Sequence, residues 1–356
     1  MAIALLVGTA HMSLSFALSQ AALAQLAALP RYTLGHGVTP LHALPRVSAA
    51  LGGPKIWIKR DDCTGLATGG NKTRKLELLL GDAQAQGCNV LITQGALQSN
   101  HARQVAAAGA VAGWPVHVVL SDAVPGRHAD YQRVGNLQLC RLLGAQVHML
   151  AADVDADAFC AALAQQLQSA GQQPYVIPMG GSNGLGALGY TAAFAEIQQQ
   201  MQALDCEMDA VVLATGSGGT QAGLMLGACL QGWSGRIHGV SVGPDQLLAT
   251  QRIQRALADA AGWLDVPAAA LQSVQTHVDV DFKGPHYGIP AASTWQAVAQ
   301  AAQQEGVLLD PVYSGKGFAG LLAACAAGGV LHTARHVVFL HTGGVAAMSA
   351  YPEVAG

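Results

Sequence analysis

The sequence predicts an α/β protein built from two open, twisted parallel sheets, and three observations lead to this prediction. The chain has 356 residues, more than one hydrophobic core ordinarily serves, so two lobes are expected. Hydrophobic residues make up 51% of it and charged residues 11%, which excludes a disordered chain and indicates wide buried layers. Short apolar runs alternate with longer helical runs, as in parallel sheets covered by helices on both faces.

The expected strands are short runs of apolar and β-branched residues that lie between turn residues. They are apolar along their whole length rather than alternating, which is typical of strands buried on both faces of a parallel sheet. In chain order they are Lys55–Lys59, Asn89–Thr93, Val116–Leu120, Gln146–Leu150, Tyr175–Pro178, Ala210–Ala214, Ile237–Val242 and Val337–His341.

Longer runs rich in Ala, Leu and Gln separate these strands and predict helices joined to them by short connections. An amphipathic helix docked on the surface is expected before them, over residues 14–29. The other expected helices are 72–86, 99–112, 130–143, 153–170, 185–203, 219–231, 244–260, 292–304 and 315–327.

The first thirty residues are apolar, yet they predict neither a secretory signal nor a membrane span. No Lys or Arg precedes the apolar stretch, whereas a secretory signal begins with such a charge. His11, Ser13 and Gln20 interrupt the run, so it lacks the unbroken apolar length of a span. We interpret Met12 as the natural start and residues 1–11 as an extension.

Charge and cysteine content narrow the class of function. The net charge is −3 without any run of Lys or Arg, which argues against nucleic acid or an anionic membrane as partner. The seven cysteines stand singly, with no C-x-x-C and no zinc spacing, so we expect no metal site and reduced, mostly buried thiols. The resulting prediction is a cytoplasmic protein that acts on a small molecule.

Residues 68–77, Thr-Gly-Gly-Asn-Lys-Thr-Arg-Lys-Leu-Glu, describe a glycine turn that feeds the start of a helix. Helix starts favour acidic side chains because their free amides are partly positive. Here the first turn instead carries three cations, Lys72, Arg74 and Lys75. This placement predicts a bound anion, with phosphate as the first candidate. A solvated basic turn is the alternative.

A second polar segment, residues 93–104, follows an apolar strand and opens a helix, where open α/β sheets bind ligands. Gln98, Ser99, Asn100 and His101 are consecutive. At a helix start they offer hydroxyl, amide and backbone donors to a substrate carboxylate. A helix cap with no ligand is the alternative.

A glycine-rich turn, Gly216-Ser217-Gly218-Gly219-Thr220, follows another apolar strand and opens the next helix. Glycines let the backbone close around phosphate oxygens, and the helix adds its positive end. No Gly-Lys-Ser/Thr follows, and Gln221 stands where G-x-G-x-x-G needs its last glycine. The turn therefore favours one phosphate monoester over a nucleotide, with a bare glycine turn as the alternative.

Two tyrosines stand in loops with dense Gly and Pro. Residues 283–290, Lys-Gly-Pro-His-Tyr-Gly-Ile-Pro, present Tyr287 within the least periodic stretch of the chain, and such stretches are more often functional than idle. Residues 310–317, Asp-Pro-Val-Tyr-Ser-Gly-Lys-Gly, place Tyr313 and Ser314 at a helix entrance. Either tyrosine alone is more often a packing residue than a catalytic one.

Taken together, six motifs resemble the fold-type II enzymes that use pyridoxal 5'-phosphate (PLP). They are GGNKTRKLE, QSNH, TGSGG, HYGIP, DPVYSGK and HTGG, in this order between about Leu34 and Gly344. Within that class the chain is similar to the branch that contains D-cysteine desulfhydrase and 1-aminocyclopropane-1-carboxylate deaminase. The resemblance implies two α/β domains with PLP in the cleft between them. It assigns residues 1–74 and 184–356 to the large domain, and residues 75–183 to a small inserted one.

The resemblance also implies roles for single residues. Lys72 is similar to the Schiff-base lysine, and Lys75 with the Gly216–Thr220 turn to the phosphate site. Asn100 would lie near the ring hydroxyl, and Gln98, Ser99 and Asn100 would bind the substrate carboxylate. Tyr287 would lie against the ring, Tyr313 would help in proton transfer, and Ser99 is a candidate for the same relay.

Two positions bear on the substrate. Ser314 stands where the deaminase has a glutamate beside the pyridine nitrogen. A hydroxyl leaves that nitrogen neutral, which suits simple β-elimination and disfavours the deaminase. His286 replaces an expected glycine, so it would narrow the pocket or contact an anionic group of the substrate.

The expected function is β-elimination from a small sulfur amino acid, as in D-cysteine desulfhydrase. Removal of the α-proton by Lys72 needs a lowered pKa, which we expect from burial beside other cations. An L-cysteate sulfo-lyase remains an alternative, with His286 or His101 at the sulfonate. A deaminase, a racemase or dehydratase of the same fold, and a non-catalytic PLP- or metabolite-binding protein also remain. A homodimer is expected.

Overall fold

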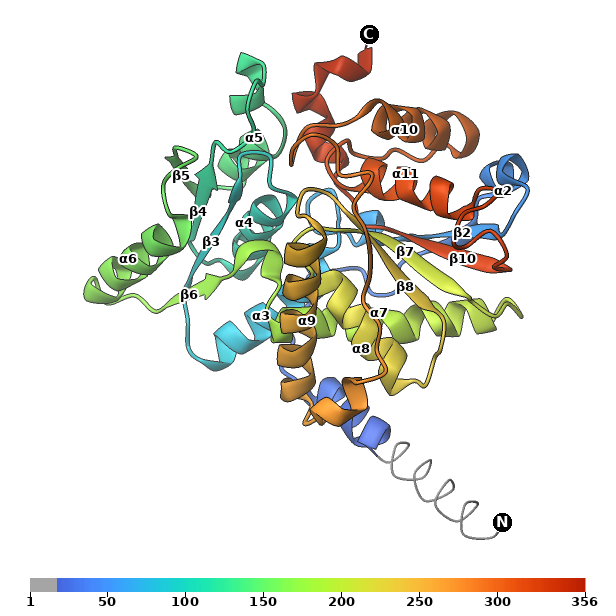
Figure 1. The fold of residues 1–356 in the computed structure, drawn as a ribbon. Helices are drawn as coiled ribbons and strands as arrows, with labels where there is room; N and C mark the ends of the chain where they lie inside the picture. Colours follow the sequence, from blue (N-terminus) through green and yellow to red (C-terminus); the bar gives the residue numbers. More distant parts are fainter. Residues whose placement is uncertain (1–17, 356) are drawn as a thin grey trace.

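The computed structural model describes residues 18–355 and consists of two sheets with helices around each (Figure 1). Residues 18–28 are helical, and Ala22 and Leu26, four positions apart on one face, are buried. This agrees with the expected docked helix. The expectations for residues 1–11 and 14–17 lie outside the described residues.

Six strands form the larger sheet in the order β1-β2-β10-β7-β8-β9. All neighbours run parallel except β1 and β2, which pair antiparallel. The register sets Val338 of β10 between Trp57 of β2 and Val211 of β7. The strands are Leu41–Ala43 (β1), Lys55–Arg60 (β2), Ala210–Thr215 (β7), Arg236–Ser241 (β8), His277–Asp279 (β9) and His336–His341 (β10).

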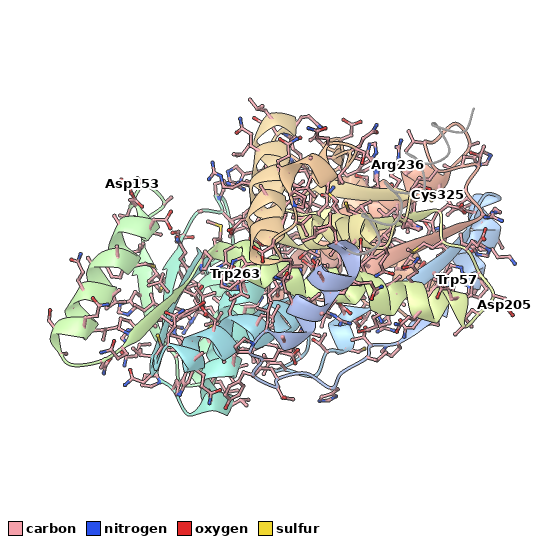
Figure 2. All side chains as sticks on the ribbon, turned by 90° about the horizontal axis from the view of Figure 1, so that it is seen from below. Trp57, Asp153, Asp205, Arg236, Trp263 and Cys325 are labelled. Atoms are coloured by element: carbon pink, nitrogen blue, oxygen red, sulfur yellow. The ribbon has the colours of Figure 1, made fainter. Side chains whose placement is uncertain are left out.

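Four strands, all parallel, form the smaller sheet in the order β5-β4-β3-β6. They are Val90–Ala96 (β3), Val116–Ser121 (β4), Gln146–Leu150 (β5) and Pro174–Ile177 (β6). Figure 2 shows the two lobes side by side, with Asp153 on the outer side of the smaller lobe and Asp205 at the opposite end of the molecule. The domain boundaries at 74/75 and 183/184 stay a prediction.

Helices cover the sheets and connect their parallel strands (Figure 1). Those around the larger sheet are Pro45–Leu51 (α2), Gly184–Gln202 (α7), Gly219–Leu230 (α8), Gln246–Trp263 (α9), Ala292–Glu305 (α10) and Ser314–Cys325 (α11). The others are Lys72–Ala85 (α3), Asn100–Ala112 (α4), Gly135–Leu142 (α5) and Ala156–Ser169 (α6). None of the helices within residues 18–355 is long and apolar enough to cross a membrane.

Strand β7 shows why a central strand of the larger sheet is apolar along its whole length. Val211 and Leu213 pack into a core cluster that contains residues of α7 and α8. Ala210 and Val212 point the other way, into a second cluster with residues of α10 and α11. Because both faces are covered, neither set of positions can be polar.

All eight expected strands are present, and the largest shift extends β3 from Thr93 to Ala96. Strands β1 and β9 were not expected, because three residues are too few for a periodic pattern. Helix α2 was not expected either. The helix expected over 130–143 is wrong in part: a 3-10 turn ends at Gln132, and α5 begins at Gly135, whose φ is 67°.

The seven cysteines, all within the described residues, are free thiols as expected. The expectation that most are buried is wrong. Only Cys140, Cys160 and Cys325 are buried, whereas three others are half-buried and Cys63 is exposed. Within residues 18–355 no group of three or more His, Cys, Asp or Glu side chains forms a metal site.

Candidate active site

A cavity of about 510 Å³ lies between the two sheets, at the carboxyl ends of their strands. Gln94 and Ser121 reach it from the smaller sheet, and Thr215, Val242 and Thr342 from the larger one. Parallel strands that end at one edge produce such a binding site. Of the described residues that line it, none is acidic. The cavity therefore favours anionic ligands.

Lys72, the first residue of α3, brings a primary amine into the cavity. Its Nζ donates a hydrogen bond of 2.9 Å to Oδ1 of Asn71, and Nδ2 of Asn71 donates one of 3.0 Å to Oγ1 of Thr220. The lysine is thus only one asparagine away from the glycine-rich turn. One small molecule can therefore meet both the amine and the turn.

Burial lowers the pKa of Lys72 to about 8, because a charged amine loses hydration in the cavity. Burial also lowers the pKa of Lys75, and repulsion from the charge of Lys72 lowers it further. The expected repulsion between neighbouring cations is thus present within this pair of lysines.

The sequence suggested that the three cations at the start of α3 bind one anion together. The structure shows instead that they have different partners. Arg74 donates to Asp61 at 2.8 Å and to Glu196 at 2.8 Å, so carboxylates of the protein already neutralise it. Lys75 takes part in none of the ion pairs between described residues. Only the two lysines remain for an external anion.

Lys75 is fully buried behind the glycine-rich turn rather than in the cavity lining. Its Nζ donates to the Gly180 carbonyl at 3.2 Å and to Oγ of Ser182 at 2.9 Å. Ser182 lies 2.7 Å from Oγ of Ser217 in the turn. The charge of Lys75 therefore supports the turn from behind, through two hydroxyls.

The turn 216–220 presents backbone and hydroxyl donors at the start of α8. Gly218, the residue before this helix, has a φ of 88°, and a Cβ there would lie 2.9 Å from the backbone nitrogen of Ile253. Only glycine fits this approach. Gly216, Ser217, Gly218 and Thr220 line the cavity, whereas the predicted Gly219 does not. Free amides at a helix start bind phosphate well.

The segment that opens α4 supplies the opposite wall. Ser99, Asn100 and His101 line the cavity. Ser99 also caps the helix, since its Oγ accepts a hydrogen bond of 3.1 Å from the backbone nitrogen of Ala102. The capping and ligand interpretations of this motif are thus compatible.

Gln98 corrects a prediction, because it does not line the cavity. Its Nε2 donates to the carbonyls of Tyr131 at 2.6 Å and Val134 at 3.0 Å. Its Oε1 accepts from the backbone nitrogen of Asn136 at 2.9 Å. With its amide engaged on all sides, Gln98 orders the neighbouring turn, and its side chain does not reach a substrate.

His101 lines the cavity as a neutral ring. Burial, followed by Lys72 and Lys75, holds its pKa well below the ordinary range. Its Nε2 lies 2.8 Å from Oγ1 of Thr93, and that hydroxyl donates its only proton to the Ile177 carbonyl. Nε2 therefore carries the ring proton, and Nδ1 is a buried acceptor without a partner among the described residues.

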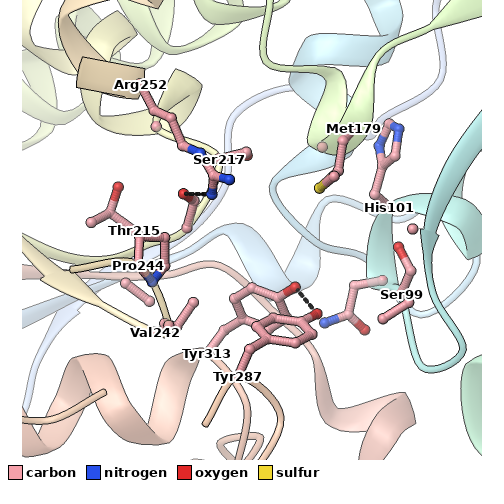
Figure 3. Close-up of a pocket in the computed structure, with 18 of the residues that line it drawn as sticks. Ser99, His101, Met179, Thr215, Ser217, Val242, Pro244, Arg252, Tyr287 and Tyr313 are labelled. Atoms are coloured by element: carbon pink, nitrogen blue, oxygen red, sulfur yellow. Dashed lines mark hydrogen bonds between the residues drawn. The ribbon is translucent and has the colours of Figure 1, made fainter. Parts of the chain in front are cut away.

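Tyr287 and Tyr313 form a pair of phenols in the cavity (Figure 3). Their hydroxyl oxygens lie 2.5 Å apart, and their rings meet edge to face at 6.0 Å. Burial raises the pKa of both hydroxyls, so both are protonated at neutral pH. In the same view Arg252 lies beside Ser217 on one side, and Ser99 and His101 lie on the other.

Two further predicted contacts are not found in the cavity. His286 is exposed, and its Nδ1 bonds to the Tyr287 carbonyl at 2.8 Å. Ser314 is fully buried, and its Oγ donates to Oδ1 of Asp310 at 2.6 Å. Neither side chain lines the cavity, so the structure does not bring them together with the other predicted site residues, and their contacts with substrate and cofactor stay predictions.

Several lining residues were not predicted from the sequence. Asn71 and Thr342 belong to quoted motifs, GGNK and HTGG, and their place next to Lys72 or directly after β10 was a usable signal. Gln94, Met179 and Arg252 also line the cavity, and no pattern in the sequence marks them.

Comparison with known proteins gives consistent results. The family described as "Pyridoxal-phosphate dependent enzyme" matches residues 32–343. A D-cysteine desulfhydrase of Serratia proteamaculans (strain 568) is 42% identical over 334 residues, which cover 93% of this chain and 98% of that protein. The enzyme of the same name from Salmonella schwarzengrund (strain CVM19633) is 40% identical over 331 residues, covering 92% and 97%.

Solved structures support the same fold. A protein described as an ACC deaminase homologue is 35% identical, with a TM-score of 0.82, over 92% of this chain and 95% of that one. A hydrogen sulfide-producing enzyme from Fusobacterium nucleatum has a TM-score of 0.59 at 18% identity, over 87% and 95% of the two chains, and shows the fold alone. The predicted fold class is confirmed.

Proposed function

The chain belongs to the family of pyridoxal-phosphate-dependent enzymes, and from this premise we propose that it is a carbon–sulfur lyase, which converts D-cysteine and water to pyruvate, sulfide and ammonia. Its cofactor is PLP. One observation carries the proposal: the amine of Lys72 has a pKa of about 8 in a cavity without acidic groups, one asparagine from an anion-binding turn.

The residues present fit this cofactor. PLP is a phosphate monoester with an aldehyde, and the cavity pairs a phosphate-type turn with a reactive amine. Lys72 would hold the aldehyde carbon, and the turn 216–220, with Lys75 behind it, would hold the phosphate. When bound, PLP supplies a ring that accepts the electron pair left by a broken C–H bond.

Lys72 is suited to act a second time, as the base. With the substrate amine bound to the cofactor in its place, the free Nζ of Lys72 would be the amine available to take the α-proton. A neutral amine is needed for this, and an ordinary lysine is almost fully charged at neutral pH. The lowered pKa makes a useful fraction of Lys72 available.

The paired phenols are suited to stabilise the leaving sulfur. Both hydroxyls keep their protons at neutral pH, and only one of the two protons is needed to bridge the pair. The other can donate a hydrogen bond to the sulfur as its bond to carbon breaks and negative charge develops on it. Tyr313 and Tyr287 would thus work as one unit.

The start of α4 is suited to hold the substrate carboxylate. Ser99 and Asn100 line the cavity there, next to the free amides of the helix start. Asn100 is itself fixed, since its Oδ1 accepts a hydrogen bond of 2.7 Å from Nδ2 of Asn136. A fixed carboxylate would orient the α-proton towards Lys72.

Charge in the cavity separates the alternative reactions. Ring opening by a deaminase needs a carboxylate at the ring nitrogen, and no acidic residue lines the described cavity. Asp310 is engaged by the Ser314 hydroxyl and by backbone amides. His286 and His101 do not supply a cation for a sulfonate, because His286 lies outside the cavity and His101 is neutral, but the Arg252 guanidinium lines the cavity. The lining thus disfavours the deaminase, whereas the products formed from D-cysteine and L-cysteate decide between release of sulfide and of sulfite.

The decisive experiment offers D-cysteine, L-cysteine, L-cysteate and 1-aminocyclopropane-1-carboxylate to the PLP-loaded protein. We expect pyruvate and sulfide in equal amounts from D-cysteine. Sulfite from L-cysteate without sulfide from cysteine would establish the sulfo-lyase instead. Cofactor absorption without turnover of any amino acid would establish a binding protein.

We further propose that the protein acts in the cytoplasm as a homodimer, with the inserted domain at residues 75–183. Free thiols at all seven cysteines support a reducing compartment. Exposed apolar side chains, such as Leu142 at 78% and Leu247 at 68%, support contacts with a second copy. Light scattering on the purified protein measures the oligomeric state directly.

A further inference from the structure

The loop that carries Tyr287, residues 283–288, is anchored by a buried lysine from another element. Lys316 lies in the first turn of α11 and is fully buried. Its Nζ donates to the Lys283 carbonyl, to the His286 carbonyl at 3.3 Å and to the Val242 carbonyl at 3.1 Å. Two of these acceptors belong to the loop, and the third directly follows β8.

The anchoring uses the whole donor capacity of this lysine. An ammonium has three N–H groups, and three main-chain carbonyls receive them. Lys316 takes part in none of the ion pairs between described residues. Burial of a cation without a counter-ion is costly. An apolar side chain would fill the space without that cost, so the hydrogen bonds to the loop are what the lysine contributes.

The far end of the loop has a second anchor. The hydroxyl of Tyr351, a fully buried residue near the C-terminus, donates a hydrogen bond of 2.8 Å to the Gly288 carbonyl. The Arg127 guanidinium lies 4.2 Å above the ring of Tyr351. Gly288 has a φ of 75°, and a Cβ there would lie 2.7 Å from Val124. The loop is therefore fixed on both sides of Tyr287.

The two anchors converge on the phenol pair. Tyr313 directly precedes α11, and Lys316 follows it by three residues, so the same helix start holds both. A shift of the loop would move Tyr287 against Tyr313 and lengthen their 2.5 Å hydrogen bond. We propose that Lys316 and Tyr351 are positioning residues, which hold the loop 283–288 so that the hydroxyl of Tyr287 stays on that of Tyr313.

The effect on turnover rests on the proposed function, whereas the effect on the loop does not. The test therefore measures both hydrogen–deuterium exchange of residues 283–288 and steady-state kinetics with D-cysteine. The variants are Lys316→Met and Tyr351→Phe. Lys59→Met is the control for a buried lysine outside the cavity, and Tyr175→Phe for a phenol bonded to Asp82 in the other lobe.

We expect faster exchange of the loop in Lys316→Met and Tyr351→Phe, and in neither control. Their kcat should fall about tenfold to a hundredfold, since small misplacements of catalytic groups have such effects. KM should change less than kcat, and the PLP absorption should stay. The controls should lose thermal stability without this loss of kcat.

Unchanged exchange of the loop in Tyr351→Phe, together with a wild-type kcat, would overturn the proposal, even if Lys316→Met does not fold. Equal losses of kcat in the loop variants and their controls would overturn it as well. A wild-type protein without turnover, whose loop still loosens in both variants, would refute the proposed function and leave the anchoring intact.

Discussion

The first turn of α3 presents two kinds of cation, and the contrast between them identifies the site. Arg74 contacts Asp61 and Glu196, so its charge is neutralised inside the protein. Lys72 and Lys75, three residues apart on the helix surface, have no such partners among the described residues. The same sequence motif thus contains a structural ion pair and an anion site.

The difference has a direct consequence for pKa values. Burial opposes the charge of Arg74, but Asp61 and Glu196 together outweigh burial and raise its pKa, so it stays charged at neutral pH. Burial without compensation lowers the pKa of Lys72 and Lys75. Buried cations without counter-ions are costly, and a protein that keeps two of them side by side has a use for a bound anion or a neutral amine.

The sharpest test of this contrast removes the reactive amine. Lys72→Ala should retain the fold, because the side chain lies in the cavity, and should lose turnover by at least about 10³-fold, since the nucleophile is absent. It should also lose the visible absorption of lysine-bound PLP. Full activity in this variant would end the proposed mechanism. Lys55→Ala, at an exposed lysine, serves as the control.

Changes to Arg74 or to its carboxylate partners should lower the stability of the protein rather than its turnover. Asp61→Asn leaves Arg74 with one carboxylate and also weakens the hydrogen bonds from Tyr190 and Thr39. Breaking a buried pair in this way should lower the free energy of unfolding by about 3 kcal/mol. Thermal melting measures this loss. Retained wild-type stability would mean that Arg74 is not neutralised as described.

The sequence located the centre of this site because its motifs are local. Lys72, the turn 216–220 and the segment 99–101 each join a strand end or a glycine turn to a helix start, and short patterns report such junctions well. Strands β3, β4 and β7 were found for a similar reason, since their burial leaves continuous apolar runs.

The errors concern side chains whose partners lie far along the chain. Gln98 looked like a ligand, but its amide is used by residues 33 to 38 positions later. Arg74 looked like part of the anion site, but Glu196 lies 122 residues away. Local patterns in a single sequence do not show which residues far apart in the chain contact one another.

A third prediction distinguishes the role of Lys75 from that of Lys72, the two lysines without a carboxylate partner among the described residues. Lys75→Met removes the charge behind the turn but keeps Lys72, so PLP should still attach, with a dissociation constant about tenfold higher because the charge-assisted hydrogen bond from Lys75 to Ser182, which supports the turn, is lost. The cofactor-free variant should melt at a higher temperature than wild type, because an unpaired buried cation is gone. Fluorescence titration with PLP measures the first effect. A lower melting temperature would show that Lys75 is stabilising.

The smallest expected effect concerns pH. Only the neutral amine of Lys72 attacks an aldehyde, and with a pKa of about 8 its neutral fraction increases about fivefold between pH 7 and pH 8. The rate at which the cofactor-free protein takes up PLP should rise by this factor and level off above pH 9. An ordinary lysine would instead give a rate that still rises about tenfold per unit up to pH 10, because its pKa lies near 10.4. A rate that still rises up to pH 10 would show that the pKa of Lys72 is not lowered. Lys72 would then resemble Arg74, and the contrast on which the assignment depends would be lost.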